Sequence, residues 1–252
     1  MKKLVSFLSL VLLAGATVGC NKTTAKEWSW KDAISDGELG YAILVGEDGN
    51  PEAEDRTKGC VDALNSIAAE GGFKAKELTR VTCTDTTGSW NDAFAKVQVE
   101  TWVKKYKGKL DFIVSNNDGM AIAASNATGL LKGTPIVGFD ALGTACDRIK
   151  KGTLAGSVSQ NGDDQALATA LVLANRVKGT NPVISANYGG RASLNLDELN
   201  SHVIQTQFAA VTKQNADTLK PGNYVAVAED SAVKGKKLLV ALYSQNDNFI
   251  QE

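Results

Sequence analysis

The sequence predicts an α/β fold built on a mostly parallel sheet. The clearest evidence lies within residues 110–142, where two short apolar runs of strand type, 111–115 and 135–139, enclose a segment with helical periodicity. Two strands joined in this way by a helix form a βαβ unit, and the strands of such a unit are parallel. Strand-like and helix-like segments alternate on both sides of this unit, which is typical of a parallel α/β sheet.

The amino terminus carries a signal for export. Residues 1–20 begin with Lys2 and Lys3, continue with an apolar stretch too short to span a membrane, and end with small residues before Cys20. Thr17-Val18-Gly19-Cys20 resembles a bacterial lipobox, which implies a diacylglycerol on the Cys20 thiol. The alternative is an ordinary cleavage site with an incidental cysteine. Residues 21–31 then form a flexible tether.

Composition agrees with a globular exported domain. The chain is 43% hydrophobic and 22% charged, with a formal net charge of -1, so no basic excess points to nucleic acid.

The first predicted elements follow the tether. A buried strand covers 41–45, and Asn50 caps the next helix, with Pro51 in its first position. Glu52 and Arg56 share one face of that helix, where such a pair is ordinarily a surface ion pair of small energy. The remaining elements are a strand at 76–83, a helix opened by residues 88–90 and reaching 106, a strand at 153–159, a helix at 163–177, a loop at 182–200 and a strand at 202–209.

Polar side chains follow the two strands of the βαβ unit. Asn117 and Asp118 follow the first strand, and Asp140 follows the second. Because parallel strands end at the same edge of a sheet, these three residues converge where open α/β folds bind ligands. Carboxylates and amides suit a ligand dense in hydroxyl groups. The alternative is that they only cap the helices that they precede.

Three segments resemble one protein family. They are SNNDGMAIAAS with TPIVGFDAL, ILVGEDGNPEAEDRTKG from Ile43, and KKGTLAGSVSQNGDDQALAT from Lys150. The family is that of the periplasmic galactose/glucose-binding proteins of methyl-galactoside ABC transporters, and the likeness covers most of residues 32–219. It implies one lobe of a type I periplasmic-binding fold, with helices on both faces of the sheet. The helix near 164–178 corresponds to one that crosses the hinge to the other lobe.

The resemblance also implies a ligand rim. Arg56, Asn117 and Asp140 match the family, and Trp90 corresponds to a tryptophan that stacks on one face of the sugar. Asn50 replaces a histidine, Glu52 an aspartate and Gln160 an asparagine, so the preferred sugar can differ. By contrast, Trp102 is interpreted as a core residue.

In the family, a calcium loop stands where this chain has residues 32–40. Asp32, Asp36 and Gly37 keep their places, but Ile34 and Gly40 replace two oxygen donors. Asp111 corresponds to a more distant glutamate and is shorter. We therefore expect a degenerate loop that keeps the turn and binds no calcium tightly. The lone histidine, His202, lacks the spacing of a zinc site.

The end of the chain resembles the start of the same family. After a linker at 220–236, residues 237–252 are similar to its first strand, with Asp247 on a sugar hydroxyl and Phe249 stacked opposite Trp90. This implies a permuted lobe order with most of the first lobe missing. We expect a truncated product, a fragment, or a half completed by a second chain.

Among the cysteines, Cys60 and Cys83 are weakly favoured as a disulfide, because the resemblance makes their elements neighbours. Three buried free thiols, including Cys146, are the equal alternative.

Taken together, the sequence predicts the sugar-binding lipoprotein of an ABC importer, anchored to a membrane, facing the periplasm and needing no cofactor. Alternative ligands are ribose, a nucleoside or an autoinducer, and a remnant that binds nothing is a further alternative. An exported hydrolase is disfavoured because the chain has neither GxSxG nor HExxH. Glu52 with Asp140 is the one carboxylate pair considered for glycosidase chemistry.

Overall fold

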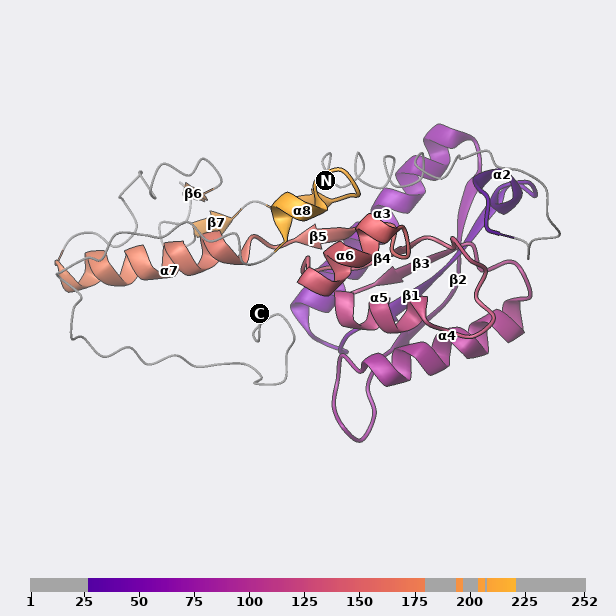
Figure 1. The fold of residues 1–252 in the computed structure, drawn as a ribbon, viewed down its shortest axis with the longest axis horizontal. Coiled ribbons are helices and arrows are strands. Elements are labelled where there is room, and N and C mark those ends of the chain that lie inside the picture. Colours follow the sequence, from indigo (N-terminus) through magenta and orange to yellow (C-terminus); the bar gives the residue numbers. More distant parts are fainter. Residues whose placement is uncertain (1–26, 180–193, 197–203, 207, 221–252) are drawn as a thin grey trace.

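A parallel sheet of four strands, in the order β2-β1-β3-β4, forms the centre of the molecule (Figure 1). The computed structural model describes residues 27–179, 194–196, 204–206 and 208–220. The four strands are β1 (Glu38–Val45), β2 (Lys74–Thr82), β3 (Phe112–Ser115) and β4 (Ile136–Val137). A parallel bridge from Val137 to Gly156 continues the sheet toward β5 (Ser157–Ser159), which pairs antiparallel with β8 (Ala209–Val211). The prediction of a mostly parallel sheet is confirmed.

Helices cover both faces of the sheet, because the strands are apolar on both faces. In β1, Leu39, Tyr41 and Ile43 face the helices α2 (Trp30–Ala33) and α3 (Pro51–Gly71). Ala42 and Leu44 alternate with them and face α4 (Asp92–Tyr106), α5 (Asp118–Ser125) and α6 (Gly143–Lys151). The two faces therefore bury two separate apolar clusters, and Trp102 of α4 lies in the second as predicted.

Asparagine caps start three of these helices. The Oδ1 atoms of Asn50, Asn91 and Asn117 accept backbone N–H groups in the first turns of α3, α4 and α5. The next helix, α7 (Gly162–Val177), leads away from the sheet toward the left of Figure 1, and α8 (Ala216–Leu219) follows β8. Within the described part of the chain, no helix is both long and apolar enough to cross a membrane.

The region after α7 differs from the sequence prediction. Residues 194–196, predicted to lie in a loop, form β6 (Leu194–Leu196), which pairs antiparallel with β7 (Ile204–Thr206). The strand that returns to β5 is β8, whereas a single strand at 202–209 was predicted. Segments of three residues are too short to show a periodicity, so the loop prediction was wrong. The single predicted strand contains β7 but only the first residue of β8. Cys20, His202, Asp247, Phe249 and residues 221–252 lie outside the described residues.

The predicted disulfide between Cys60 and Cys83 is also wrong. Cys60 lies in α3 among the apolar side chains on one face of the sheet, and Cys83 lies among those on the other face. With the sheet between them, the two sulfur atoms cannot approach each other. Cys60, Cys83 and Cys146 are all buried free thiols, as the alternative prediction held.

The loop at residues 32–40 retains its turn. Gly37 has a φ of 81°, and the Oδ1 atom of Asp36 accepts the N–H of Glu38 at 3.1 Å. Asp32 belongs to α2, while Asp111 reaches the Gly40 N–H at 2.9 Å with its Oδ2 atom. No three His, Cys, Asp or Glu side chains in the described regions are grouped as a metal site would need.

The buried carboxyl group of Asp111 is predicted to make the stability of the folded protein depend on pH. Burial, partly offset by the Gly40 N–H and reinforced by the charge of Asp36, raises the pKa of the Asp111 carboxyl from 3.8 to about 6. Between these two pH values the folded chain binds the proton more tightly than the unfolded chain, so stability falls as the pH rises from about 4 to 6. A shift of this size corresponds to roughly 3 kcal/mol.

We expect the Asp111→Asn variant to show a smaller decrease in melting temperature across this pH range than wild type. Burial also raises the pKa of Asp92 to about 6, so part of the slope remains. Asp55→Asn, at an exposed position on α3, is the control and keeps the wild-type slope. Identical slopes for Asp111→Asn and wild type would contradict this account.

Candidate functional site

The candidate site lies at the edge of the sheet where the parallel strands end. Arg56 reaches this edge from α3, Asp140 follows β4, and Gln160 follows β5. Their polar atoms meet there: Arg56 Nη1 lies 3.4 Å from Asp140 Oδ1, and Gln160 Nε2 donates to the same Oδ1 at 2.5 Å. The structure thus brings together three of the side chains that the sequence placed on one rim.

Arg56 is the centre of this cluster. Its Nη1 donates to the backbone carbonyl of Asn116 at 2.8 Å, and its Nη2 contacts Glu52 Oε2 at 3.0 Å. Only 11% of its side chain is exposed, compared with 68% for Glu52. A buried guanidinium held at several points presents its N–H groups in a fixed plane, which suits recognition of oxygen atoms.

Aromatic rings enclose the guanidinium. Its carbon lies 5.7 Å from the centre of the Trp90 ring and 5.3 Å from that of Phe139, distances at which a cation interacts with aromatic rings. Trp90 also packs on Gly46, where an added Cβ would lie 2.1 Å from the indole. Trp90 has a φ of 57°, so the backbone is held in the left-handed region to bring the ring into this position.

Asp140 stands on a turn of unusual backbone geometry. Asp140 and the following Ala141 have φ values of 109° and 60°, a backbone region that residues other than glycine seldom occupy. The side chain of Asp140 is 7% exposed. Such a conformation persists only where surrounding contacts impose it.

Asp118 and Ser157 supply those contacts. Asp118 Oδ2 accepts the N–H of Leu142 at 2.9 Å, and its Oδ1 accepts the hydroxyl of Ser157 at 2.7 Å. Ser157 Oγ in turn accepts the N–H of Ala141 at 3.1 Å. We name this pair of side chains the turn clamp. Burial, with the charge of Asp140 adding to it, raises the pKa of the Asp118 carboxyl well above its usual value.

Gly138 leaves the space that the Asp118 side chain of the turn clamp occupies. An added Cβ on Gly138 would stand 2.2 Å from Asp118 Oδ1 and 3.1 Å from the Asp118 Cα. Only glycine therefore allows β4 to pass so close to the start of α5.

Three other predicted residues have local partners. Asn50 Oδ1 accepts the N–H groups of Glu52 and Ala53, and Asn117 Oδ1 accepts that of Met120. The capping role weighed for Asn117 is therefore present. Glu52 lies outside the buried cluster and reaches it only through Arg56.

Sequence reasoning did not place Asn116, Phe139 or Ser157 in the site. Asn116 is fully buried, and its side chain bonds to the N–H of Gly46 and the hydroxyl of Thr57, which joins β1, β3 and α3 behind Arg56. Its position directly after β3 was a signal that could have identified it. Ser157 carried no such signal, because its partner Asp118 is 39 residues away along the chain.

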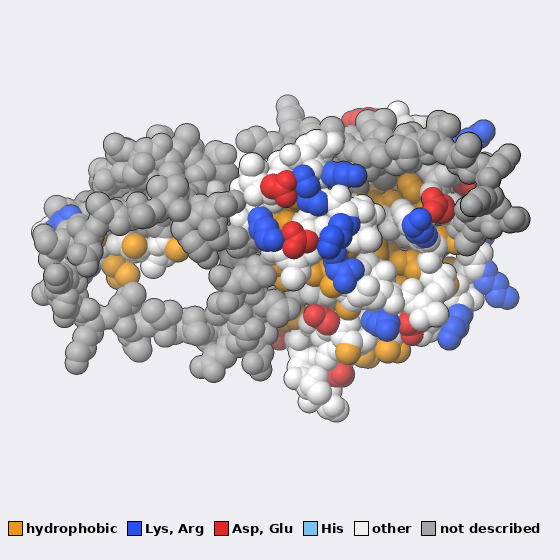
Figure 2. Space-filling view, in the orientation of Figure 1, with side chains coloured by type: hydrophobic (Ala, Val, Ile, Leu, Met, Phe, Trp, Pro, Cys, Tyr) orange, Lys and Arg blue, Asp and Glu red, His pale blue; other side chains and the backbone are white. Residues whose placement is uncertain are grey.

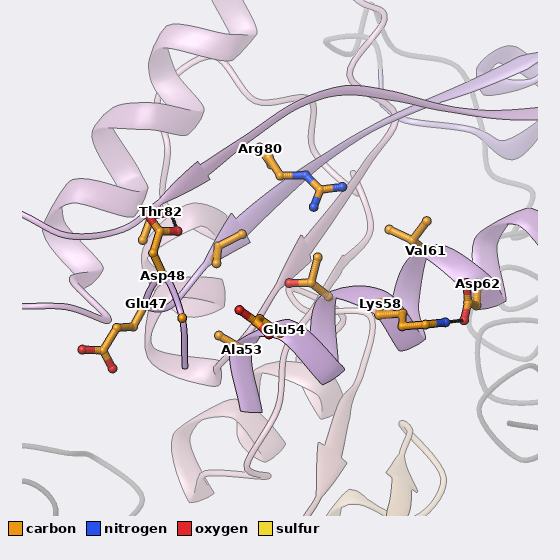
Figure 3. Close-up of a pocket in the computed structure, with 12 residues that line it drawn as sticks. Glu47, Asp48, Ala53, Glu54, Lys58, Val61, Asp62, Arg80 and Thr82 are labelled. Carbon is orange, nitrogen blue, oxygen red and sulfur yellow. Dashed lines mark hydrogen bonds and ion pairs between the residues drawn. The ribbon is translucent and has the colours of Figure 1, made fainter. Parts of the chain in front are cut away.

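A separate groove of about 410 Å³ lies between α3 and β2 (Figure 3). Glu54, Lys58 and Val61 line it from α3, and Arg80 and Thr82 line it from β2. Its basic groups already have acidic neighbours, since Lys58 pairs with Asp62 at 2.5 Å and Arg80 with Glu77 at 2.6 Å. None of the rim residues described above lines it, so the Arg56 cluster is the stronger candidate site.

The geometry of the rim favours binding. Asp140 and Gln160 offer oxygen acceptors, Arg56 offers donors, and Trp90 offers an apolar face. A molecule with hydroxyl edges and an apolar face would satisfy all three kinds of group.

Comparison with known proteins gives the family. Residues 25–181 match the model of the periplasmic binding protein domain. The D-galactose/methyl-galactoside binding periplasmic protein of Haemophilus influenzae is 35% identical over 202 residues, which cover 78% of this chain and 56% of that protein. A xylitol-binding protein of Mycolicibacterium smegmatis is 33% identical over 107 residues, which cover 38% of this chain and 30% of that protein.

Solved structures show the same fold. The Caulobacter myo-inositol binding protein bound to myo-inositol aligns with a TM-score of 0.55 at 18% identity, covering 86% of this chain and 60% of that one. A solute binding protein from Actinobacillus succinogenes with bound D-allose gives 0.56 at 20% identity, covering 74% and 57%. This chain thus spans little more than half the length of these relatives. Because the family model covers most of the described sheet and its helices, the chain belongs to the periplasmic binding protein domain family.

Proposed function

We propose that this chain binds a glucose- or galactose-type monosaccharide as the substrate-binding component of an ABC sugar importer. The observation that carries the proposal is the Arg56–Asp140–Gln160 cluster beside Trp90, at the edge where parallel α/β sheets bind ligands. Asp140 accepts from sugar hydroxyls, Arg56 donates to them, and the indole covers the apolar face of the ring. The galactose-binding relative from Haemophilus influenzae supports this ligand class, and no catalytic step is part of the proposal.

The proposal includes the cellular setting. Cys20 carries a lipid, the domain faces the periplasm as its relatives' names imply, and an ABC permease receives the sugar. Residues 32–219 form one lobe, and residues 237–252, with Asp247 and Phe249, belong to the facing lobe. Closure of two lobes about a hinge is the usual way in which such receptors retain a ligand.

Calorimetric titration of residues 21–252 with glucose and galactose tests the sugar assignment. We expect binding in the micromolar range and, for Trp90→Ala, an affinity lower by about fivefold, since stacking on an aromatic ring contributes roughly 1 kcal/mol. Trp30→Ala is a matched control, because Trp30 packs on Phe73 among the residues of α2 and β2 and not at the rim. No heat from a cooperatively folding protein would contradict the proposal.

A panel of ribose, a nucleoside and an autoinducer, titrated in the same way, tests the alternative ligands. Asn50, Glu52 and Gln160 differ from the residues expected for galactose, so preference for one of these compounds over both hexoses would replace the sugar assignment while leaving the site in place.

A further inference from the structure

Four lysines gather at the end of α4. Lys104 and Lys105 lie in its last turn, and Lys107 and Lys109 follow it within the next four residues. All four are exposed, and none forms a salt bridge with another described residue. Tyr106 stands among them, with its ring 5.0 Å from the ammonium group of Lys105 and its hydroxyl donating to the carbonyl of Leu78. We call these four lysines the basic end.

The basic end lies opposite the ligand rim. Lys109 precedes β3, and the neighbouring N–H of Asp111 donates to Gly40 near the start of β1, so the lysines stand where the parallel strands begin. In Figure 1 this end, with α2, is at the right, whereas α7 leaves toward the left. Figure 2 shows basic side chains at this right-hand end. Because the ligand rim and the predicted hinge-crossing helix α7 both lie at the other end, neither covers the four lysines.

Other charges near the starts of the strands largely cancel. Lys132 contacts Glu27 at 2.6 Å, and Lys76 contacts Glu38 at 2.8 Å. The carboxylate of Asp111 is buried against the Gly40 N–H and faces away from solvent. In and beside the neighbouring loop there are two lysines, Lys31 and Lys74, and two acids, Asp32 and Asp36, so their formal charges sum to zero. Lys104 interacts with Glu100, which also pairs with Lys96, so the basic end keeps a surplus of positive charge although the whole chain has a formal charge of -1.

Helix electrostatics alone do not explain the cluster. Cations in the last turn of a helix are favoured by its dipole, and this accounts for Lys104 and Lys105. Lys107 and Lys109 lie beyond the helix, where the dipole effect is weak. Like charges this close repel one another, so their accumulation favours a negatively charged partner.

The amino-terminal segment enters at the same end. The N–H of Trp28 donates to the carbonyl of Lys132 just before β4, and Trp30 packs against Phe73 just before β2. Cys20 is seven residues before Glu27, a length of chain that reaches at most about 25 Å. A lipid on Cys20 would therefore hold the basic end close to a bilayer, at a high effective concentration.

We propose that the basic end docks on the anionic phospholipid surface of the membrane. Lysines near such a surface interact with the headgroups over about one Debye length, roughly 8 Å. Docking in this orientation turns the rim away from the membrane and toward the solvent that supplies the ligand. The proposal uses the lipid anchor of the proposed function only to bring the two surfaces together, and the sugar site plays no part in it.

Energy transfer from the native tryptophans to a dansyl headgroup label tests the proposal with the full-length chain. Vesicles of phosphatidylcholine are compared with vesicles that contain about 30% phosphatidylglycerol, enough to give the surface a negative potential. We expect greater transfer with the anionic vesicles, because Trp28 and Trp30 lie at the docking end, and loss of this increment in high salt.

Two quadruple variants separate the basic end from general charge. Replacing Lys104, Lys105, Lys107 and Lys109 by glutamine is expected to weaken partitioning onto the anionic vesicles by at least about tenfold. The control replaces Lys58, Arg80, Lys178 and Lys213 by glutamine, which removes the same charge from other surfaces, and should retain the increment. Equal transfer in both kinds of vesicle, or equal loss in both variants, would overturn the proposal. Transfer to the neutral vesicles reports the anchor alone, so failure of the anchor is distinguished from failure of the basic end.

Discussion

The Asp118→Ala variant is expected to be about 3 kcal/mol less stable than wild type, because the N–H of Leu142 and the hydroxyl of Ser157 both lose their buried acceptor. We also expect sugar affinity to fall by at least about tenfold, since Asp140 is no longer held in its left-handed conformation. Chemical denaturation and calorimetric titration measure the two effects. Amide hydrogen exchange at residues 140–142 should become much faster, and this holds whether or not sugar is present.

A second substitution distinguishes positioning from general stability. Glycine adopts positive φ at little cost, so Ala141→Gly in the Asp118→Ala background should recover part of the affinity while stability remains low. Asp111→Ala is the matched control, because Asp111 is also a buried carboxylate that accepts one backbone N–H, but at the other end of the strands. The control should lose stability with unchanged exchange at 140–142. If both variants affect that turn equally, the turn clamp has no specific role.

Replacing Arg56 by methionine is expected to reduce sugar affinity by about 100-fold, or about 3 kcal/mol. The substitution keeps an apolar stem between Trp90 and Phe139 but removes the donors to Asn116 and Asp140. Asp140 is then left buried without its cation, which further favours a collapsed or hydrated rim. Calorimetric titration at constant pH gives the affinity, and thermal unfolding shows whether the fold is retained.

Lysine at position 56 tests the geometry of the guanidinium. An ammonium group carries the same charge as a guanidinium, but it lacks the planar set of N–H groups with which Arg56 contacts both the Asn116 carbonyl and Glu52. The sugar affinity of Arg56→Lys should therefore remain at least about tenfold weaker than that of wild type. Lys58→Met is the control on the same helix, where an exposed lysine pairs with Asp62. Its affinity should stay within about threefold of wild type. A full recovery by Arg56→Lys would show that charge alone matters.

Local sequence was sufficient to predict most of the central fold. The apolar runs of β1 and β3 and the asparagine caps of α3 and α5 depend on neighbouring residues, so they could be identified without knowledge of the tertiary structure. The parallel arrangement followed from the strand-helix-strand order, and with it the predicted convergence of Asn117, Asp118 and Asp140 at one edge. Arg56 and Gln160 were placed at that edge by the family resemblance, and the structure brings both to Asp140. The short strand β6 was missed because three residues carry no usable periodicity, and β7 was predicted as part of one longer strand.

Tertiary structure alone decided how these side chains are used. Cys60 and Cys83 were close enough in the predicted topology to suggest a bond, but the side of the sheet that each faces depends on the register of its own element. The turn clamp joins residues 39 positions apart, and the left-handed turn at Asp140 exists because these distant partners impose it. The sequence by itself determined that the residues following β3 and β4 lie at one edge of the sheet, since the order of strands and helices is encoded locally. Packing between distant segments decided their conformation, because contacts across the chain outweigh local backbone preference.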